Sequence, residues 1–129
     1  CVFVGVGLGA LYAALKLAPR PVLIISPETL GEGASSAWAQ SGVAAAMDKA
    51  DAASFHAEDT MRAGAGTVDK AVADFVTGEA KAHIFDVTAL GTPFDRNSAG
   101  EYALSREAAY CFARVVRVKG DQAGLDCQG

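Results

Sequence analysis

The strongest constraint on the fold is a glycine-rich turn near the start of the chain, in the stretch VFVGVGLGALYAALKLA. The apolar run at residues 2–4 is typical of a buried strand, and the following pattern predicts a helix over residues 8–18, ended by two prolines. Between them, Gly5, Gly7 and Ala10 fit the pattern G-x-G-x-x-G/A. In that pattern the glycines permit a tight turn and close backbone approach to a pyrophosphate, and the third small residue lets the helix pack on the strand. The turn therefore predicts a phosphate site at a helix start.

A second strand completes the unit. Residues 22–25 are fully apolar and rich in β-branched side chains, which predicts a strand covered on both faces. Strand, turn, helix and strand form a βαβ unit, whose crossover length suits a parallel pair. A pyrophosphate would lie at the helix N-terminus, where N–H groups and the helix dipole favour anions. The candidate cofactor-binding residues here are Gly5, Val6, Gly7, Leu8, Gly9 and Ala10; a glycine turn that holds no nucleotide is the competing interpretation.

The end of the second strand departs from a common dinucleotide pattern. Such sites place Asp or Glu about 20 residues after the glycines, to hold the ribose hydroxyls. Here the strand ends at Ser26, and Glu28 lies slightly beyond. This departure argues against plain NAD binding. Ser26 is the candidate ribose contact, and Glu28 is either a second contact or a solvated loop carboxylate.

Composition excludes several classes of function. The chain has 129 residues, half of them apolar, and a net charge of −4 without a basic cluster, which disfavours a nucleic-acid partner. No apolar run reaches transmembrane length, so no membrane partner is expected. The three cysteines have no C-x-x-C spacing, which argues against a zinc site or a disulfide framework and favours a reducing cytoplasm. The chain starts at Cys1 and stops at GLDCQG, where a new helix would begin, so we expect part of a longer domain.

Two further helices are expected in the middle of the chain. The first covers residues 51–63, with Asp51 or Ser54 as its N-cap. The second starts at Asp69, its cap, and closes at Gly91, with an interruption or bend allowed at Gly78. Its predicted apolar face consists of Val72, Phe75, Val76, Ala80, Ile84, Val87 and Leu90.

The last third of the chain reads as β-structure. Residues 93–96 and 101–105 flank a turn at NSAG and predict a hairpin. Residues 112–118, FARVVRV, alternate in polarity and predict a strand with a solvated face that carries Arg114 and Arg117.

The long loop after the second strand carries a family resemblance. Its segment reads Ser35, Ser36, Ala37, Trp38, Ala39, Gln40, Ser41 and Gly42. It resembles the S/T-x-x-A-Q-G-G segment of the fumarate reductase, succinate dehydrogenase and L-aspartate oxidase flavoproteins, in which this segment wraps the flavin. Ser41 replaces the first glycine of the usual pair. The resemblance implies that these eight residues bind FAD. Respiratory members carry a covalently linked histidine at the position of Ser35, so the resemblance implies noncovalent FAD here.

Three more stretches are similar to the L-aspartate oxidase branch of that superfamily. They are HAEDTMRAGAG at 56–66, GTPFDR at 91–96 and LSREAAY at 104–110. Glu107 matches the glutamate that orients the substrate's amino group in those oxidases, and a carboxylate there would pair with the α-ammonium of L-aspartate. An exposed hairpin glutamate is the competing interpretation. Ala108, Ala109 and Tyr110 depart from the G-G-H of the oxidase pattern.

The resemblance implies a fold and an activity. The fold class is α/β: a Rossmann-like FAD-binding domain, of which residues 1–129 form an incomplete N-terminal part without the capping domain. The implied reaction oxidises L-aspartate to iminoaspartate by hydride transfer to FAD, with O2 or fumarate as acceptor, as the first step of de novo NAD biosynthesis. The catalytic arginine would lie outside this chain. We expect the isolated chain to bind FAD weakly or not at all and to turn over nothing.

Two other functions stay open at this stage. One is a flavoprotein of the fumarate reductase or succinate dehydrogenase type, and the other is a non-catalytic α/β nucleotide-binding module. His56 is expected to pack or cap, and His83 has no partner evident in the sequence. Cys111 is expected to be an inert small residue, and Arg114 a solvated strand arginine although it matches a family arginine. No metal site is expected.

Overall fold

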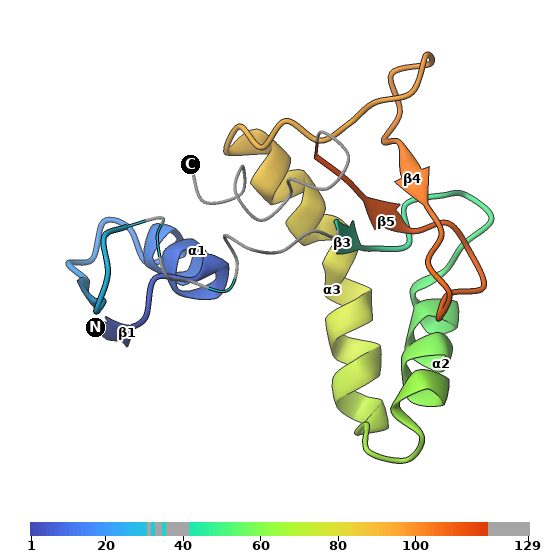
Figure 1. The fold of residues 1–129 in the computed structure, drawn as a ribbon, viewed down its shortest axis with the longest axis horizontal. Coiled ribbons are helices and arrows are strands. Elements are labelled where there is room, and N and C mark those ends of the chain that lie inside the picture. Colours follow the sequence, from blue (N-terminus) through green and yellow to red (C-terminus); the bar gives the residue numbers. More distant parts are fainter. Residues whose placement is uncertain (31, 33–34, 36–41, 119–129) are drawn as a thin grey trace.

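A computed structural model describes residues 1–30, 32, 35 and 42–118 of the chain. Figure 1 shows two parts along the longest axis. At one end lie β1 (Val2–Val4), α1 (Leu8–Lys16) and β2 (Leu23–Ile25). At the other lie a small sheet of β3 (Val43–Ala44), β4 (Leu104–Ser105) and β5 (Val115–Val116) and, below it, α2 (Ala53–Gly64). The first half of α3 (Lys70–Ala89) runs beside α2, and its second half continues past β3.

The predicted βαβ unit is confirmed. Strands β1 and β2 pair in parallel, with Val2 opposite Leu23 and Val4 opposite Ile25. The helix α1 starts directly after the glycine turn, and it ends at Lys16, slightly before the two prolines. The α/β class and the strand–turn–helix context of the glycine pattern therefore both hold.

The prediction that both strands of this unit are buried is wrong for the chain as it stands. Val4 is 84% exposed, and Val2, Leu23 and Ile25 are about half exposed or more. Alternate side chains of a strand point to opposite faces, and α1 lies over only the face that carries Ile24, where it lines a groove together with that residue. The other face of this two-stranded sheet is open among the described residues.

The two predicted middle helices are present, with one corrected cap. The Asp69 carboxylate accepts a hydrogen bond of 3.1 Å from the Val72 amide, so it caps α3 as expected. The N-cap of α2 is Ala52, without a side-chain cap, so the assignment of that cap to Asp51 or Ser54 is wrong. The Asp51 side chain binds an arginine instead. The helix α3 runs unbroken through Gly78.

The predicted apolar face of α3 is correct only in its C-terminal half. Ile84 is buried in the core, with Ala80 and Val87 packed against it. Val72, Phe75, Val76 and Leu90 are more than half exposed. In the N-terminal half the small residues Ala73 and Thr77 are buried instead, and Thr77 donates to the Ala53 carbonyl oxygen of α2. Close approach of the two helices selects small side chains, which an apolar periodicity does not reveal.

The small sheet is antiparallel, in the order β3-β5-β4. The turn at Asn97 is confirmed, because its side-chain oxygen accepts from the Ala99 and Glu101 amides and Arg96 bridges to Tyr102. The hairpin between residues 93–96 and 101–105 is shorter than predicted. It contains one bridge, between Arg96 and Tyr102, and Leu104 and Ser105 pair with β5 instead.

The central strand β5 overturns another prediction. Val115 and Val116 are both fully buried, so the expected solvated face of this strand is wrong. The core below it consists of Ala45, Ile84, Phe94, Val116 and Val118. Within the described ranges, no helix is both long and apolar enough to cross a membrane.

Two glycines with contrasting surroundings test the packing of the chain against β5. A Cβ on Gly42 would overlap the carbonyl oxygen of Val116, whereas Gly78 is an exposed α3 position with no atom near its Cβ. We expect Gly42→Ala to lower the free energy of unfolding by about 1–3 kcal/mol through overpacking. Gly78→Ala should raise it by roughly 1 kcal/mol, because alanine favours a helix. Urea unfolding of both variants measures this, and equal effects would contradict the described packing.

Candidate functional site

The glycine turn presents an open helix N-terminus. Gly5 has a φ of +112° and Gly7 is the N-cap of α1, which has neither a side-chain cap nor an acidic residue in its first turn. No atom lies within 4 Å of a Cβ built on Gly5 or Gly9. The first N–H groups of a helix lack intrahelical partners and carry the positive end of its dipole. The turn therefore fits the pyrophosphate of a dinucleotide.

The other turn residues support this cradle. Val6 is buried, so its side chain points into the protein, and Ala10 is half-buried. The Gly5 amide donates to the Ile25 carbonyl oxygen over 2.8 Å, which ties the turn to the end of β2.

Ser26 directly follows β2. It lies close to the glycine turn, because the Gly5 amide is bonded to the carbonyl oxygen of the preceding residue, Ile25. Its hydroxyl oxygen accepts from the Glu28 amide over 3.3 Å, and Glu28 itself is exposed. A serine hydroxyl has one donor and two acceptor positions, so this local bond leaves Ser26 able to contact a ribose. Its role there stays a prediction.

The predicted flavin loop is described only at its ends. Ser35 is exposed, and Gly42 passes against the backbone of β5. The other predicted flavin contacts, Ser36, Ala37, Trp38, Ala39, Gln40 and Ser41, lie outside the described residues.

Glu107 lies in the loop of residues 106–113 that joins β4 to β5. It is half-buried, and its carbonyl oxygen accepts from the Tyr110 amide over 3.0 Å. Among the described residues, no side chain or amide donates to its carboxylate. The carboxylate is therefore available to a ligand.

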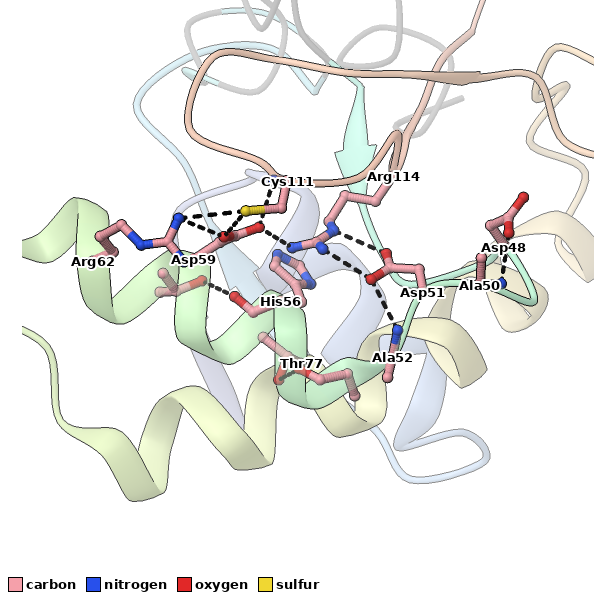
Figure 2. Close-up of polar contacts among 12 residues, drawn as sticks. Asp48, Ala50, Asp51, Ala52, His56, Asp59, Arg62, Thr77, Cys111 and Arg114 are labelled. Atoms are coloured by element: carbon pink, nitrogen blue, oxygen red, sulfur yellow. Dashed lines mark hydrogen bonds and ion pairs between the residues drawn. The ribbon is translucent and has the colours of Figure 1, made fainter.

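The structure reveals a buried arginine that sequence reasoning misjudged. Arg114 is fully buried, and Figure 2 shows its guanidinium between two carboxylates. It donates from Nε and Nη2 to the two oxygens of Asp51, over 3.0 and 2.9 Å, and from Nη1 to Asp59 over 2.9 Å. The expectation of a solvated arginine is therefore wrong. Asp59 lies in one of the family-like stretches and Arg114 matches a family arginine, but Asp51 lies in none of these stretches, and both pairings of Arg114 span more than 50 residues of chain.

Asp59 joins this arginine to the loop that carries Glu107. Its carboxylate accepts from the Cys111 amide over 2.8 Å and from the Cys111 thiol over 3.0 Å, and Arg62 lies 3.2 Å away. Burial pushes the pKa of Asp59 up, but the Cys111 hydrogen bonds and the charges of Arg114 and Arg62 outweigh burial and lower the pKa. Asp59 is therefore an anion at neutral pH.

The two histidines differ in their surroundings. His56 is buried with its ring edge-on to Tyr110, in agreement with a packing role. Burial, and secondly the charge of Arg114, lowers the pKa of His56. His83 does have a partner, contrary to the expectation: its Nδ1 lies 2.9 Å from the Tyr12 hydroxyl.

That tyrosine belongs to a polar cluster between α1 and α3. Tyr12 donates to Asp86 over 2.8 Å, and Lys16 pairs with the same carboxylate oxygen over 2.6 Å. Hydrogen bonds from Lys16 and Tyr12 lower the pKa of Asp86. The cluster therefore links α1 to α3. No cluster of metal-ligating side chains occurs in the part of the chain that the structure describes.

Comparison with known proteins identifies the family of the chain. A family model described as FAD binding domain matches residues 1–124. L-aspartate oxidases of Caulobacter vibrioides and Agrobacterium fabrum are 47% and 40% identical to the chain over 126 and 123 residues, each covering 95% of it. Those matches cover 25% and 24% of the relatives, so the chain spans about a quarter of their length.

Solved structures show the same fold. Mycobacterium smegmatis Sdh1 in complex with UQ1 matches with a TM-score of 0.91 and 27% identity, over 98% of this chain and 22% of that one. A quinol-fumarate reductase with menaquinol molecules matches with a TM-score of 0.89 at 21% identity, which is a likeness of fold alone.

The fold and the open helix N-terminus define a dinucleotide-binding α/β protein. The chain belongs to the FAD-binding domain family, and its resemblance to the L-aspartate oxidases, inferred from the motifs, is confirmed. The glycine turn, with its uncapped helix and open Gly5 and Gly9, fits the pyrophosphate of FAD.

The lowered pKa of His56 predicts an acid-sensitive fold. An unfolded histidine titrates near pH 6.5, so below that pH the unfolded chain binds the proton more readily than the folded one. Stability therefore falls as the pH drops from about 6.5 toward the lower folded pKa, by at most about 1.4 kcal/mol per pH unit. Urea unfolding between pH 7.5 and 5 would show this slope, and His56→Gln should reduce it. An unchanged slope in the variant would contradict the assignment.

Proposed function

We propose that this chain is the FAD-binding N-terminal part of a flavoprotein that oxidises L-aspartate to iminoaspartate. The observation that carries the proposal is the 47% identity to an L-aspartate oxidase over 95% of the chain. The matched stretch includes Glu107, whose carboxylate has no partner among the described residues. The remaining three-quarters of such a protein would contain the capping domain and the catalytic arginine.

The glycine turn would hold the pyrophosphate of FAD. Backbone amides from Val6 to Gly9 lie at the start of α1, where the helix dipole stabilises negative charge. Ser26 would contact the ribose, and residues 35–42 would line the flavin. FAD, when bound, supplies the hydride acceptor for oxidation of the substrate. Serine at position 35 cannot form the histidyl link of covalent members, so the FAD would be noncovalent.

Glu107 would recognise the amino group of the substrate. L-aspartate differs from succinate by an α-ammonium, and a half-buried carboxylate with free acceptor positions would form a charge-assisted hydrogen bond with it. A glutamate in this position discriminates between the two diacids, because succinate offers no cation to balance a carboxylate that becomes buried. The electron acceptor would be O2 or fumarate, and the enzyme would act in the cytoplasm, at the start of de novo NAD biosynthesis.

The second candidate is an enzyme that acts on succinate or fumarate. The likeness of fold to Sdh1 and to the quinol-fumarate reductase favours it. Glu107 and the absence of a histidine at position 35 favour the aspartate reaction.

Substrate discrimination in the full-length enzyme tests the assignment. We expect turnover of L-aspartate and little turnover of succinate. Glu107→Gln should lower kcat/KM for L-aspartate by roughly 10- to 100-fold, since a hydrogen bond to a charged group contributes about 1.5–3 kcal/mol. Glu101→Gln, in the exposed hairpin, is the matched control and should leave kcat/KM unchanged. Turnover of succinate in preference to L-aspartate would contradict the proposal.

Cofactor preference of the isolated chain is a separate test. Titration with FAD, NAD and ATP, followed by quenching of flavin fluorescence or by calorimetry, should show FAD binding that is weak or undetectable and no tighter binding of the other two. A clear preference for NAD or ATP would support a different nucleotide-binding module. A purified chain that carries flavin and produces peroxide with L-aspartate would contradict the expectation that the chain alone is inactive.

A further inference from the structure

The loop of residues 106–113 is closed at its base. It leaves β4 after Ser105 and returns to β5 at Val115. The Arg114 amide donates to the Ser105 carbonyl oxygen over 3.1 Å, so the two ends of the loop are joined by a backbone hydrogen bond. Nothing in this bond fixes the direction in which the loop leaves the sheet.

Side chains on one face of α2 fix that direction. Asp59 accepts the amide and the thiol of Cys111, and Phe55 stacks on Phe112 with ring centroids 5.5 Å apart and planes 10° apart. His56 lies edge-on to Tyr110. Residues 110–112 are therefore held along the helix, and the Tyr110 amide in turn holds the Glu107 carbonyl oxygen.

Arg114 connects the base of the loop to the same helix. It forms a bidentate pair with Asp51, just before α2, and a third hydrogen bond with Asp59 inside α2. All three side chains are at most 1% exposed. Only the planar guanidinium can bind two carboxylates at once with this geometry, because a lysine ammonium is a point donor.

Stability alone is a poor reason for such a cluster. Removing charges from water costs free energy that their attraction often fails to recover, and buried ion pairs are commonly replaceable by apolar residues without loss. The cluster instead joins three segments at defined distances. Arg114 lies just before β5, Asp51 lies just before α2, and Asp59 also binds Cys111 of the loop. Figure 2 shows the arginine, both acids and Cys111.

We propose that Arg114 is a positioning residue for Glu107, and that its clamp between Asp51 and Asp59 holds the substrate-recognition loop against α2. The inference rests on the proposed function, because it takes Glu107 as the group that meets the substrate's ammonium. Arg114 itself does not touch the substrate. It fixes the loop at two points. One is the base of the loop, where Arg114 itself lies, and the other is Cys111, which binds the Asp59 carboxylate that Arg114 also binds.

The test is a double-mutant cycle in the full-length enzyme. Arg114→Lys keeps the charge and loses the fork, and it should lower kcat/KM for L-aspartate by roughly 10- to 100-fold, since misplacing a substrate-orienting group by about 1 Å has an effect of that size. In a Glu107→Gln background the same substitution should have little further effect, because the group it positions is already disabled. The FAD affinity and the flavin absorption spectrum should stay as in the wild type.

Two further variants make the cycle decisive. Arg96→Lys, on the hairpin arginine that stacks over Tyr102 at 3.7 Å, is the matched control and should leave kcat/KM unchanged. Asp51→Asn, which retains the Asp59 bond, provides a milder perturbation if Arg114→Lys does not fold, and should also lose its effect in the Glu107→Gln background. Additive losses, or a parallel loss of FAD affinity, would overturn the positioning role. A wild-type enzyme inactive on L-aspartate would instead overturn the proposed function.

Discussion

The buried pairing of Arg114 with Asp51 and Asp59 is the interaction on which the arrangement of α2 and the three-stranded sheet depends. It brings together the segment before α2, the helix itself and the strand β5. Burying the three charges is tolerable only because each is paired, and losing one partner would leave a charge uncompensated in the interior. The small sheet, the α2 contact and the loop with Glu107 are consequently assembled around one guanidinium.

A second polar cluster joins α3 to α1, the helix that follows the glycine turn. Tyr12 and Lys16 of α1 share the Asp86 carboxylate of α3. This cluster is partly exposed, so it orients more than it stabilises. The glycine turn before α1 and the loop of residues 106–113 lie toward opposite ends of the longest axis in Figure 1.

Local patterns were read correctly where the neighbours along the chain determine the structure. The glycine turn, the parallel βαβ unit, the Asp69 cap and the turn at Asn97 all depend on residues within one short segment. The predictions failed where packing partners are distant. The burial of β1 and β2, the N-terminal half of the α3 face and the environment of Arg114 are examples.

The sequence by itself determined the family and the strand–turn–helix context of the glycine pattern, because each is carried by contiguous motifs. Only the tertiary structure decided what becomes of the charges. Asp51 suited an N-cap and Arg114 suited a solvated strand, and each prediction was locally reasonable. Folding places the Arg114 guanidinium and the Asp51 carboxylate 2.9 Å apart across 63 residues of chain, where each buried charge needs the other as its partner because neither can be hydrated.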